Sequence, residues 1–526
     1  MHGSVVLFRD EDRGCRVAGA RAASMRTVSR LALRRMRLGL LTVVVGCGGD
    51  TVVEAPAVPD APVIPRVRGV VMISLDTLRA DRLGFMGYDR DTSFNLDGVA
   101  RRSVVFEQAR AQSTQTAPSH ASLLLSAYAG AHGIVNVHYG DLEAPVLPPD
   151  AVSLAEALAA SGIRTAAFVS GGNFTRTMDM NRGFGVWDER NEDVAGRIDQ
   201  FLRWLPTVGD DRFFALVHTY QVHAPYVPPA AEAARFTSPA YRGALRATYD
   251  RYLSLPMQEA WALGVGPDYW PPEMVEYTPD DVRFLSDLYD GEVAYLDGQL
   301  RRLLEAILTG PRAEDTALLI LSDHGEEFRD HGRFQHDQVF DELARVPLVV
   351  YAGRGLERQG WKGRIESPVQ LIDVAPTVAD LLGVPWTDFN WSGRSLAEHL
   401  DPVRRARLGR TDGAPVFTEL TREHRTQFYS AVAWQGWKYI LHRQTTNKKT
   451  WEHLFNLEVD PGEQVNLIDS EEAVATRMRE ALRGLLRSFD EQNALHAAEL
   501  GRTEPSALSK EQLEELKRLG YTGTPH

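Results

Sequence analysis

Short, continuous runs of apolar residues recur through the middle of the chain, and each run ends in polar residues. Runs of this length are typical of strands that are buried on both faces of a parallel sheet. In open α/β sheets, the side chains that follow the carboxyl ends of such strands face the ligand site. We therefore predict buried strands over residues 70–75, 165–170, 213–218, 316–322 and 346–351.

Helical patterns lie between these strands. Apolar residues spaced by three and four positions predict helices over residues 153–161 and 280–308. Alternation of strands and helices over this length predicts an α/β fold, in which a large, mostly parallel sheet is sandwiched between helices.

The pattern changes after about residue 410. Short strands without long helices between them are predicted over 415–420, 429–434, 437–441 and 453–457, and helices over 471–497 and 509–519. Strands that follow one another so closely are typical of antiparallel sheets. We predict a catalytic domain over residues 68–409 and a C-terminal subdomain over 410–526, with a smaller antiparallel sheet.

The first segment has the order of an export signal. Residues 1–46 hold nine arginines against three acidic residues, and a run of nine apolar or small residues, 38–46, precedes Cys47. Nine residues are too few to span a bilayer, which takes about 20 in a helix. The order of basic, apolar and small residues predicts a lipoprotein-type signal over 1–46, lipidation of Cys47 and a linker over 47–67. The alternative is a membrane-anchoring or disordered arm.

Charge and cysteine content narrow the class of protein. The chain has a net charge of −13 and 44% hydrophobic residues. An acidic body argues against a nucleic-acid partner, because phosphate backbones are bound by lysine and arginine. With only two cysteines, Cys15 and Cys47, the chain has no disulfide framework.

A helix start at Thr116 is the first candidate for chemistry. The segment Gln115-Thr116-Ala117-Pro118 is followed by helix-forming residues, which places Thr116 at or beside the N-cap. Unpaired N–H groups and the local dipole at such a terminus favour a tetrahedral oxyanion. The hydroxyl of Thr116 could then attack phosphorus or sulfur. An ordinary capped helix is the alternative.

The predicted strand ends suggest a metal site beside this hydroxyl. Asp76 and the pair Asp323-His324 each follow a buried strand, so the sheet edge receives hard oxygen and imidazole ligands. With Thr116 as a fourth ligand, they form a mixed site for one divalent cation: Ca²⁺, Mn²⁺, Mg²⁺ or Zn²⁺. Such a cation would favour the threonine alkoxide. His223 and His336, in loops after strands, are candidates to protonate a leaving oxygen.

These residues lie in motifs that resemble the sulfatase branch of the alkaline phosphatase superfamily, over residues 68–520. The motifs are Ile73 to Asp81, His218 to Tyr226, Leu321 to Phe328 with His331 and His336, Asp373 to Thr377, and Leu454 to Leu467. The resemblance implies that Asp76, Asp323 and His324 bind the metal and that Thr116 is the nucleophile. It also implies that His223 and His336 contact substrate. We assign Arg79, in the first motif, to substrate binding as well.

The nucleophile motif departs from the family pattern. Typical sulfatases have C/S-x-P-x-R, whose first residue is oxidised to formylglycine, whereas this chain has Thr116-Ala117-Pro118-Ser119-His120. Threonine is not a formylglycine precursor, and no cysteine follows Cys47. His120 replaces the arginine and is grouped with the catalytic residues. With a threonine as its nucleophile, the chain is more similar to the phosphonate monoester hydrolases and lipoteichoic acid synthases of the same superfamily than to typical sulfatases.

Three functions follow from these observations. The first is a metal-dependent hydrolase or transferase that acts on phosphate, phosphonate or phosphodiester groups by direct attack of Thr116. The second is a sulfatase that works without formylglycine, and the third is a non-catalytic surface lipoprotein that keeps the fold for binding. The expected partner is a small-molecule, glycan or lipid ester. Membrane contact is expected only through the lipid anchor, at the bacterial cell envelope.

Overall fold

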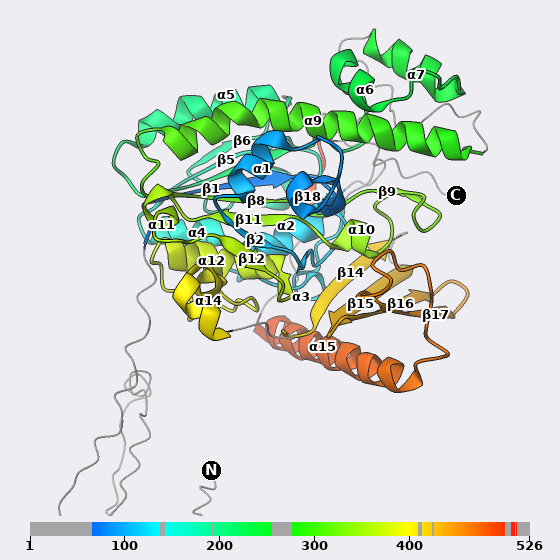
Figure 1. The fold of residues 1–526 in the computed structure, drawn as a ribbon. Helices are drawn as coiled ribbons and strands as arrows, with labels where there is room; N and C mark the ends of the chain where they lie inside the picture. The colour runs from blue at the N-terminus through cyan, green and yellow to red at the C-terminus, as the bar shows by residue number, and fades with distance from the viewer. Residues whose placement is uncertain are drawn as a thin grey trace, which may run out of the picture. The chain divides into compact units, whose positions relative to one another are not determined.

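The predicted buried strands lie side by side in one eight-stranded sheet (Figure 1). The computed structural model describes residues 66–136, 143–190, 193–254, 276–408, 413–422, 426–499, 506–510 and 512. In sheet order the strands are β12 (Gly363–Ile365), β2 (Val104–Phe106), β11 (Leu348–Tyr351), β8 (Thr316–Leu321), β1 (Gly69–Leu75), β7 (Phe213–Thr219), β5 (Arg164–Phe168) and β6 (Val186–Asp188).

The sheet is mostly parallel, as predicted. β8, β1, β7, β5 and β6 run in one direction, whereas β11 pairs antiparallel with both β8 and β2. The chain returns from β8 to β11 without a long helix between them, and a return of this kind gives antiparallel pairing. The apolar run at 346–351 predicted a buried strand but carried no signal for its direction.

Helices cover both faces of the sheet, which confirms the predicted sandwich. Along β1, Val70 and Met72 face one core, and Val71 and Ile73 face the other. The first core is completed by α2 (Thr116–Leu125), α4 (Leu154–Ala160) and α12 (Val374–Leu381). The second is completed by α1 (Phe94–Ala100), α5 (Val194–Trp204) and α9 (Pro279–Thr309), and Figure 1 shows α5 and α9 over that face.

Local sequence fixes the start of the long helix α9. The hydroxyl of Thr278 accepts a hydrogen bond from the N–H of Asp281, the Asp281 carboxylate accepts one from the N–H of Thr278, and Pro279 occupies the first turn. This capping box satisfies donors that a helix start otherwise leaves unpaired. α9 runs for 31 residues, close to the predicted 280–308.

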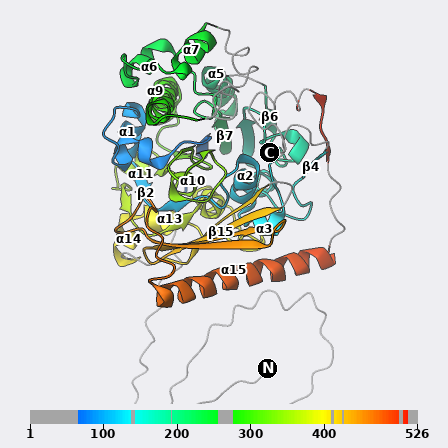
Figure 2. The same cartoon turned by 90° about the vertical axis from the view of Figure 1, so that its right-hand side faces the viewer.

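The C-terminal region forms the predicted small antiparallel sheet of four strands. They are β14 (Val416–Arg422), β15 (Gln427–Trp434), β16 (Trp437–Gln444) and β17 (Lys449–Asn456). Gln435 and Gly436 both have positive φ, which suits the tight turn from β15 to β16. α15 (Glu472–Glu499) covers one face, as Figure 2 shows, and the other face packs on Val339 and Phe340.

Hydrogen bonds and ion pairs join this small sheet to the body of the protein. The hydroxyl of Thr418 donates to the carbonyl of Ala111 (2.6 Å), and the N–H of Glu419 donates to the carbonyl of Gln112 (2.9 Å). The ammonium of Lys438 is buried 2.8 Å from Asp341 and 3.0 Å from Glu463. β14 is therefore fixed beside the segment that enters α2.

The remaining elements are short. The helices are α3 (Ala129–His132), α6 (Ala230–Phe236), α7 (Ala244–Leu253), α10 (Asp341–Ala344), α11 (Arg354–Glu357), α13 (Ala397–Leu400) and α14 (Pro402–Leu408). The strand pairs are β3 (Ala109–Arg110) with β13 (Val369–Gln370), β9 (Glu327–Phe328) with β10 (Phe334–Gln335), and β4 (Glu143–Ala144) with β18 (Ser506–Ala507). Within the described ranges, no helix combines the length and the apolar character that crossing a membrane requires.

Several sequence predictions fall outside the described residues. The signal over 1–46, Cys47 and all but the last two residues of the linker are among them, as are the domain boundary at 409–410 and most of the predicted helix 509–519. The predicted division into domains therefore stays a prediction.

Candidate active site

Three neighbouring strands at the centre of the sheet deliver the predicted site residues. In the register of the sheet, Ser74 of β1 lies opposite His218 of β7 and Leu321 of β8. Asp76 follows β1, and Asp323 and His324 follow β8. Because the three strands are parallel, their carboxyl ends meet at one edge. The side chains of Asp76, Asp323 and His324 are fully buried there.

Thr116 lies at the same edge of the sheet as Asp76, Asp323 and His324. Gln115 is the N-cap of α2, and Thr116 is the first helical residue. The hydroxyl oxygen of Thr116 is 3.2 Å from Oδ2 of Asp76 and 3.5 Å from Nε2 of His324. The structure thus brings the candidate nucleophile into contact with two of the predicted metal ligands.

The donor set fits a divalent cation. One ligand atom from each of Asp76, Asp323 and His324 lies within 4.8 Å of the others. Oδ1 of Asp76 and Oδ2 of Asp323 are buried without a hydrogen-bond partner. Nδ1 of His324 donates to the carbonyl of Gly325 (2.9 Å), so Nε2 carries the lone pair that a metal needs. Unpaired buried oxygens beside such an imidazole are what a cation would satisfy.

The pKa shifts of the three predicted ligands agree with a cation between them. Burial raises the pKa of Asp76 to about 7, and burial together with the Asp76 charge raises the pKa of Asp323 well above its usual range. Burial also lowers the pKa of His324. Two adjacent buried carboxylates resist ionisation unless positive charge is placed between them. A bound cation would therefore reverse both carboxylate shifts.

Backbone geometry around the ligands is unusual at two positions. A Cβ on Gly325 would lie 1.9 Å from the carbonyl oxygen of Glu342, so glycine is required where the two segments cross. Thr77, next to Asp76, has φ of 56°, which is rare for a β-branched residue. Such strain is characteristic of functional sites.

His120 lies beneath the nucleophile with both ring nitrogens engaged. Nδ1 donates to the carbonyl of Thr116 (2.9 Å), which leaves Nε2 to accept from the hydroxyl of Ser74 (2.9 Å). The ring stacks on Phe174, and burial lowers the pKa of His120 well below its usual range. This geometry orients the start of α2 through a neutral imidazole. The predicted catalytic role of His120 stays a prediction.

His223 and His336 lie beside each other near the metal ligands. Their ring centroids are 5.3 Å apart, and His336 is 4.6 Å from the ring of His324. Burial and His336 lower the pKa of His223 to about 4. Burial opposes charge on His336 too, but the carboxylate of Glu326, 3.3 Å away, outweighs it and raises the pKa. The surroundings thus move the two pKa values apart, and His336 holds a proton more readily than His223 does.

Arg79 is held by two acidic side chains and a backbone carbonyl. Its guanidinium pairs with Asp81 (2.7 Å) and Asp330 (3.0 Å) and donates to the carbonyl of Glu326. These contacts fix the segment that leads from the metal ligands towards His336. Among the described residues, the hydrogen bonds and ion pairs of Arg79 do not reach the metal ligands or Thr116, and its assignment to substrate binding stays a prediction.

One expectation about the helix start is wrong. The N–H groups in the first turn of α2 were expected to be unpaired, but the N–H of Ala117 donates to Oδ1 of Asn136 (2.8 Å). Pro118 has no N–H, and the N–H of Ser119 donates to Gln115. A side chain distant in sequence therefore caps the turn, and any oxyanion must be held mainly by side chains and a cation.

His218 also lies in the site, although it was not among the predicted site residues. Its Nε2 lies 3.3 Å from Oδ2 of Asp76, the same oxygen that accepts from Thr116. Burial lowers the pKa of His218 to about 3, so the ring is neutral. The signal was available, because His218 ends an apolar run next to the strand that carries Asp76.

A second group of potential ligands has a structural explanation. Among the described residues, Glu327, His331 and Glu342 also bring ligand atoms within 4.8 Å of one another. Nδ1 of His331 donates to Glu342 (2.7 Å), and Glu327 accepts from the backbone of His331 and Arg333 and from Gln338. These groups satisfy one another without an ion.

Comparisons with known proteins agree with this geometry. A model of the sulfatase family matches residues 68–384, and a model of the C-terminal region of N-sulphoglucosamine sulphohydrolase matches 329–489. A choline-sulfatase of Rhizobium meliloti is 31% identical over 201 residues, which cover 37% of this chain and 35% of that protein. An arylsulfatase of Clostridium perfringens is 28% identical, over 35% of this chain and 36% of that protein. The chain thus matches about a third of the length of these curated relatives.

Solved structures share the fold at low sequence identity. A phosphonate monoester hydrolase of Agrobacterium radiobacter aligns with a TM-score of 0.62 and 22% identity, over 84% of this chain and 100% of that one. A 2-O GAG sulfatase aligns with a TM-score of 0.61 and 19% identity, over 85% and 96%. Because the family model covers more than half of the 526 residues, this chain belongs to the sulfatase family.

Proposed function

We propose that the protein is a metal-dependent hydrolase or transferase that acts on phosphate, phosphonate or phosphodiester groups by direct attack of Thr116. One observation carries this proposal: the Thr116 hydroxyl lies against Asp76 and His324, where two buried carboxylate oxygens have no partner. The fold shared with a phosphonate monoester hydrolase is consistent with it.

The chain's own residues account for each proton and bond. The Thr116 hydroxyl donates to Asp76 (3.2 Å), which is placed to take its proton as the oxygen attacks phosphorus. The threonine–phosphorus bond forms as the bond to the leaving oxygen breaks, and His336, held by Glu326, gives that oxygen a proton. Water or an alcohol then attacks phosphorus and loses its proton to His336, while the threonine–phosphorus bond breaks and Thr116 takes back from Asp76 the proton that it gave.

A divalent cation would be held by Asp76, Asp323 and His324, with Thr116 beside it. When bound, it supplies positive charge that favours the threonine oxyanion and offsets the charge of the substrate. His218 and His120 position this set: the first donates to Asp76 and the second fixes the backbone of Thr116.

Sulfate-ester hydrolysis without formylglycine is the second candidate. The curated relatives are named as sulfatases, and sulfate and phosphate esters share tetrahedral geometry. Elimination of sulfate from a formylglycine hydrate is closed to threonine, so direct displacement on phosphorus is favoured. A non-catalytic binding protein is the third candidate, and the intact ligand set argues against it.

A screen of the metal-reconstituted protein tests these candidates. Aryl phosphodiester, phosphonate and sulfate substrates are compared for Thr116→Ala, Thr116→Ser and the wild type, with Thr450→Ala at an exposed position as the matched control. We expect phosphorus esters to be the best substrates. Turnover by Thr116→Ala should be lower by at least about 10³-fold, while the metal stays bound. Thr116→Ser should retain part of the wild-type turnover.

The outcomes separate the three candidates. A covalent phosphothreonine detected at Thr116 by mass spectrometry supports direct attack. Unchanged turnover in Thr116→Ala refutes it, and release of sulfate alone favours the second candidate. Absence of both turnover and stoichiometric metal favours the third.

We also propose that the protein is exported to the cell envelope and anchored through lipidated Cys47. The support is the basic, apolar and small order of residues 26–47. Metabolic labelling with a radioactive fatty acid should mark the wild type and leave Cys47→Ser unlabelled. Equal labelling of the two would contradict the anchor. The substrate is then a small-molecule, glycan or lipid ester that reaches the envelope.

A further inference from the structure

A pocket lies between the end of α1 and the edge strand β12, outside the candidate active site. Its volume is about 470 Å³. Three apolar and three basic side chains form most of its wall: Phe85, Ala100 and Val105, and Arg101, Lys362 and Arg364. The apolar residues are buried or half-buried, whereas the basic residues are exposed. The pocket therefore has an apolar floor and a cationic rim, and neither Thr116 nor any predicted metal ligand lines it.

The positive charge on this rim is only partly compensated. Arg364 pairs with Glu107 and donates to the carbonyl of Phe85 (2.9 Å). The side chains of Arg101 and Lys362, by contrast, form no hydrogen bond or ion pair with any of the described residues. Two of the three rim cations are therefore open to a ligand.

The acidic groups nearby are already engaged elsewhere. Asp97 is the only acidic residue among those that line the pocket, and its carboxylate accepts hydrogen bonds from a backbone N–H and from the hydroxyl of Ser93, both at 2.9 Å. Glu357, which is close enough to interact electrostatically with Lys362, is paired with Arg102 at 2.7 Å. An anionic ligand would thus meet cations to which no carboxylate is bound.

A further cation lies behind the pocket wall. Gly363 lines the pocket, and a Cβ at this position would lie 3.0 Å from a guanidinium nitrogen of Arg405. Arg405 donates to the carbonyls of Lys362 (2.8 Å) and His399 (3.3 Å), and among the described residues no ion pair to it is present. The charge of Arg405 therefore adds to that of the rim.

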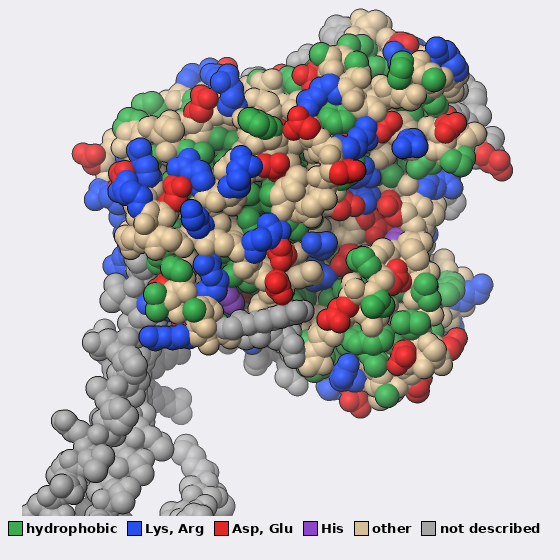
Figure 3. Space-filling model, in the orientation of Figure 1, with side chains coloured by type: hydrophobic (Ala, Val, Ile, Leu, Met, Phe, Trp, Pro, Cys, Tyr) green, Lys and Arg blue, Asp and Glu red, His purple; other side chains and the backbone are tan. Residues whose placement is uncertain are grey.

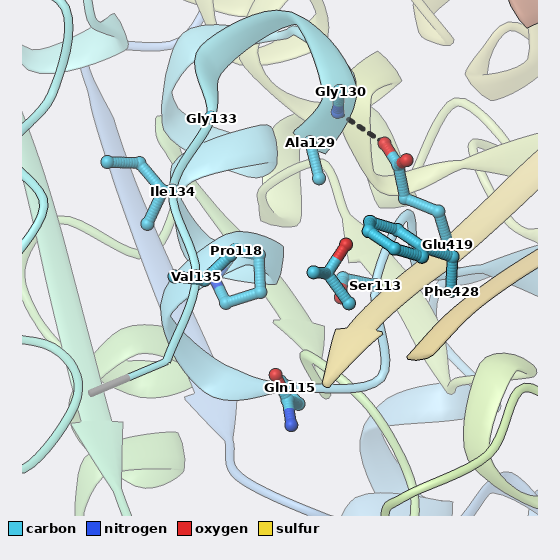
Figure 4. A pocket seen from close by; sticks show the side chains of 11 residues that line it. Ser113, Gln115, Pro118, Ala129, Gly130, Gly133, Ile134, Val135, Glu419 and Phe428 are labelled. Carbon is cyan, nitrogen blue, oxygen red and sulfur yellow. Dashed lines mark hydrogen bonds between the residues drawn. The ribbon is translucent and has the colours of Figure 1, made fainter. Parts of the chain in front are cut away.

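This positive rim contrasts with the charge of the protein elsewhere. The chain as a whole has a net charge of −13, yet Figure 3 shows Lys and Arg side chains gathered on the face where Figure 1 places α11, β12 and α1. The pocket beside α2, shown in Figure 4, has the opposite charge: Glu419 is the only charged residue that lines it, and its carboxylate accepts from the N–H of Gly130. An anion is thus attracted to the pocket beside α1 and repelled from the pocket beside α2.

An exposed aromatic ring lies on the same face of α1 as the rim. Phe94 is 70% exposed, and it lies two helical turns before Arg101, so the two side chains share a face of the helix. Exposed apolar rings beside basic groups are typical of surfaces that meet amphiphilic or lipid ligands.

We propose that the pocket beside α1 binds an amphiphilic anion, in which a phosphate or similar oxyanion is joined to an alkyl chain. The oxyanion is held by Arg101 and Lys362, and the alkyl chain lies on the apolar floor. This inference goes beyond the proposed function, because none of these residues takes part in the reaction at Thr116. Such a group has two sources, a soluble alkyl phosphate and the headgroup of an anionic lipid.

Charge and size both support this class of ligand. An oxyanion gives the rim cations the charge-assisted hydrogen bonds that they lack, and a guanidinium matches its geometry. A tetrahedral oxyanion fills only part of 470 Å³, which leaves room for an organic group. Each methylene that leaves water for the apolar floor should raise affinity about fourfold.

Protection of Lys362 from acetylation tests the pocket directly. The rate of acetylation is measured by mass spectrometry in the full-length protein at low, constant ionic strength, and exposed Lys449 on β17 is the internal control. The probes are n-hexylphosphonate, methylphosphonate and n-hexyltrimethylammonium; the C–P bond of a phosphonate is not an ester and survives hydrolase activity. We expect n-hexylphosphonate to protect Lys362 and leave Lys449 unchanged. Methylphosphonate should need a concentration at least about tenfold higher, and the cation should not protect.

A variant locates the oxyanion. Arg101→Gln removes one rim cation, keeps a good helix former and leaves Lys362 as the reporter. The concentration of n-hexylphosphonate that gives half-maximal protection should rise about three- to fivefold, as expected for an exposed charge. Arg487→Gln makes the same charge change at an exposed position of α15 and should leave that concentration unchanged.

Vesicles separate the two sources of the ligand. Protection of Lys362 but not Lys449 by vesicles of phosphatidylglycerol in phosphatidylcholine, and not by phosphatidylcholine alone, identifies a lipid headgroup. Protection by n-hexylphosphonate without protection by vesicles identifies a soluble alkyl phosphate, and both outcomes support the pocket. Equal protection of Lys362 and Lys449, equal potency of the two phosphonates, or an unchanged response in Arg101→Gln overturns it. No arm depends on turnover, so the result is independent of the proposed function.

Discussion

A buried glutamate on α9 makes stability depend on pH in a way that can be measured. Glu292 is 2% exposed, and it accepts hydrogen bonds from Nε2 of Gln221 and from the N–H of Val227, both at 2.7 Å. These two residues flank His223 in the loop that follows β7. Burial raises the pKa of Glu292 from 4.5 to about 8. Oε1 of Gln221 is buried without a partner, so a rotated amide could accept from a protonated Glu292.

The sign of the effect follows from this raised pKa. A group that binds its proton more tightly in the folded state stabilises the fold fully below the unfolded pKa of 4.5, and this contribution is lost as pH rises through about 8. One proton corresponds to a slope of about 1.4 kcal/mol per pH unit. Over the whole interval the free energy of unfolding should fall by about 5 kcal/mol through this residue.

Glu292→Gln is the perturbation that isolates the effect. Glutamine accepts from Val227 and donates to the rotated amide of Gln221 without carrying a charge. Urea unfolding of the wild type and the variant is measured at each pH unit from 5 to 9, with Glu305→Gln at an exposed position of the same helix as the control. The stability difference should move in favour of Glu292→Gln as pH rises. Parallel pH profiles for the wild type and Glu292→Gln would refute the reasoning.

Two further predictions concern charged groups in the interior. Asp323→Asn removes one of the two adjacent carboxylates, so metal affinity measured by competitive chelation should fall by at least about 100-fold while the fold persists by circular dichroism; retained stoichiometric metal would exclude Asp323 as a ligand. Lys438→Met leaves Asp341 and Glu463 buried without their shared cation, and the free energy of unfolding should fall by about 3–5 kcal/mol in urea titrations. A Lys438→Met variant as stable as the wild type would show that Arg110 alone compensates Asp341.

Local sequence predicted the parts of the fold that depend on burial. The apolar runs of β1, β7 and β8 are long enough to be recognised, and each ends at a residue of the site. β2 and β12 have three residues each, too few to show a period, and both were missed. The direction of β11 depends on how the chain returns from β8, which its own residues do not encode.

The candidate site also has a part that could be predicted from the sequence and a part that could not. Asp76, Asp323 and His324 were predicted to meet because parallel strands share an edge. The contact of Asn136 with Ala117 depends on the loop after α3 returning to the first turn of α2, and no local pattern carries it. Glu419 lies in an ordinary half-polar strand, and its place beside Ser113 becomes visible only once β14 is paired with the body. Long-range pairing therefore supplied what sequence reasoning could not.

The pairing of β14 with residues 111–113 has a consequence for the order of assembly. The ribosome delivers a chain from its amino terminus, so the loop entering α2 emerges about three hundred residues before its β-partner. Until β14 arrives, the carbonyls of Ala111 and Gln112 lack the donors that Thr418 and Glu419 supply, and Ser113 lacks its bridge partner. We therefore expect a nascent chain to fix the segment that enters α2 only late in synthesis, once β14 has emerged.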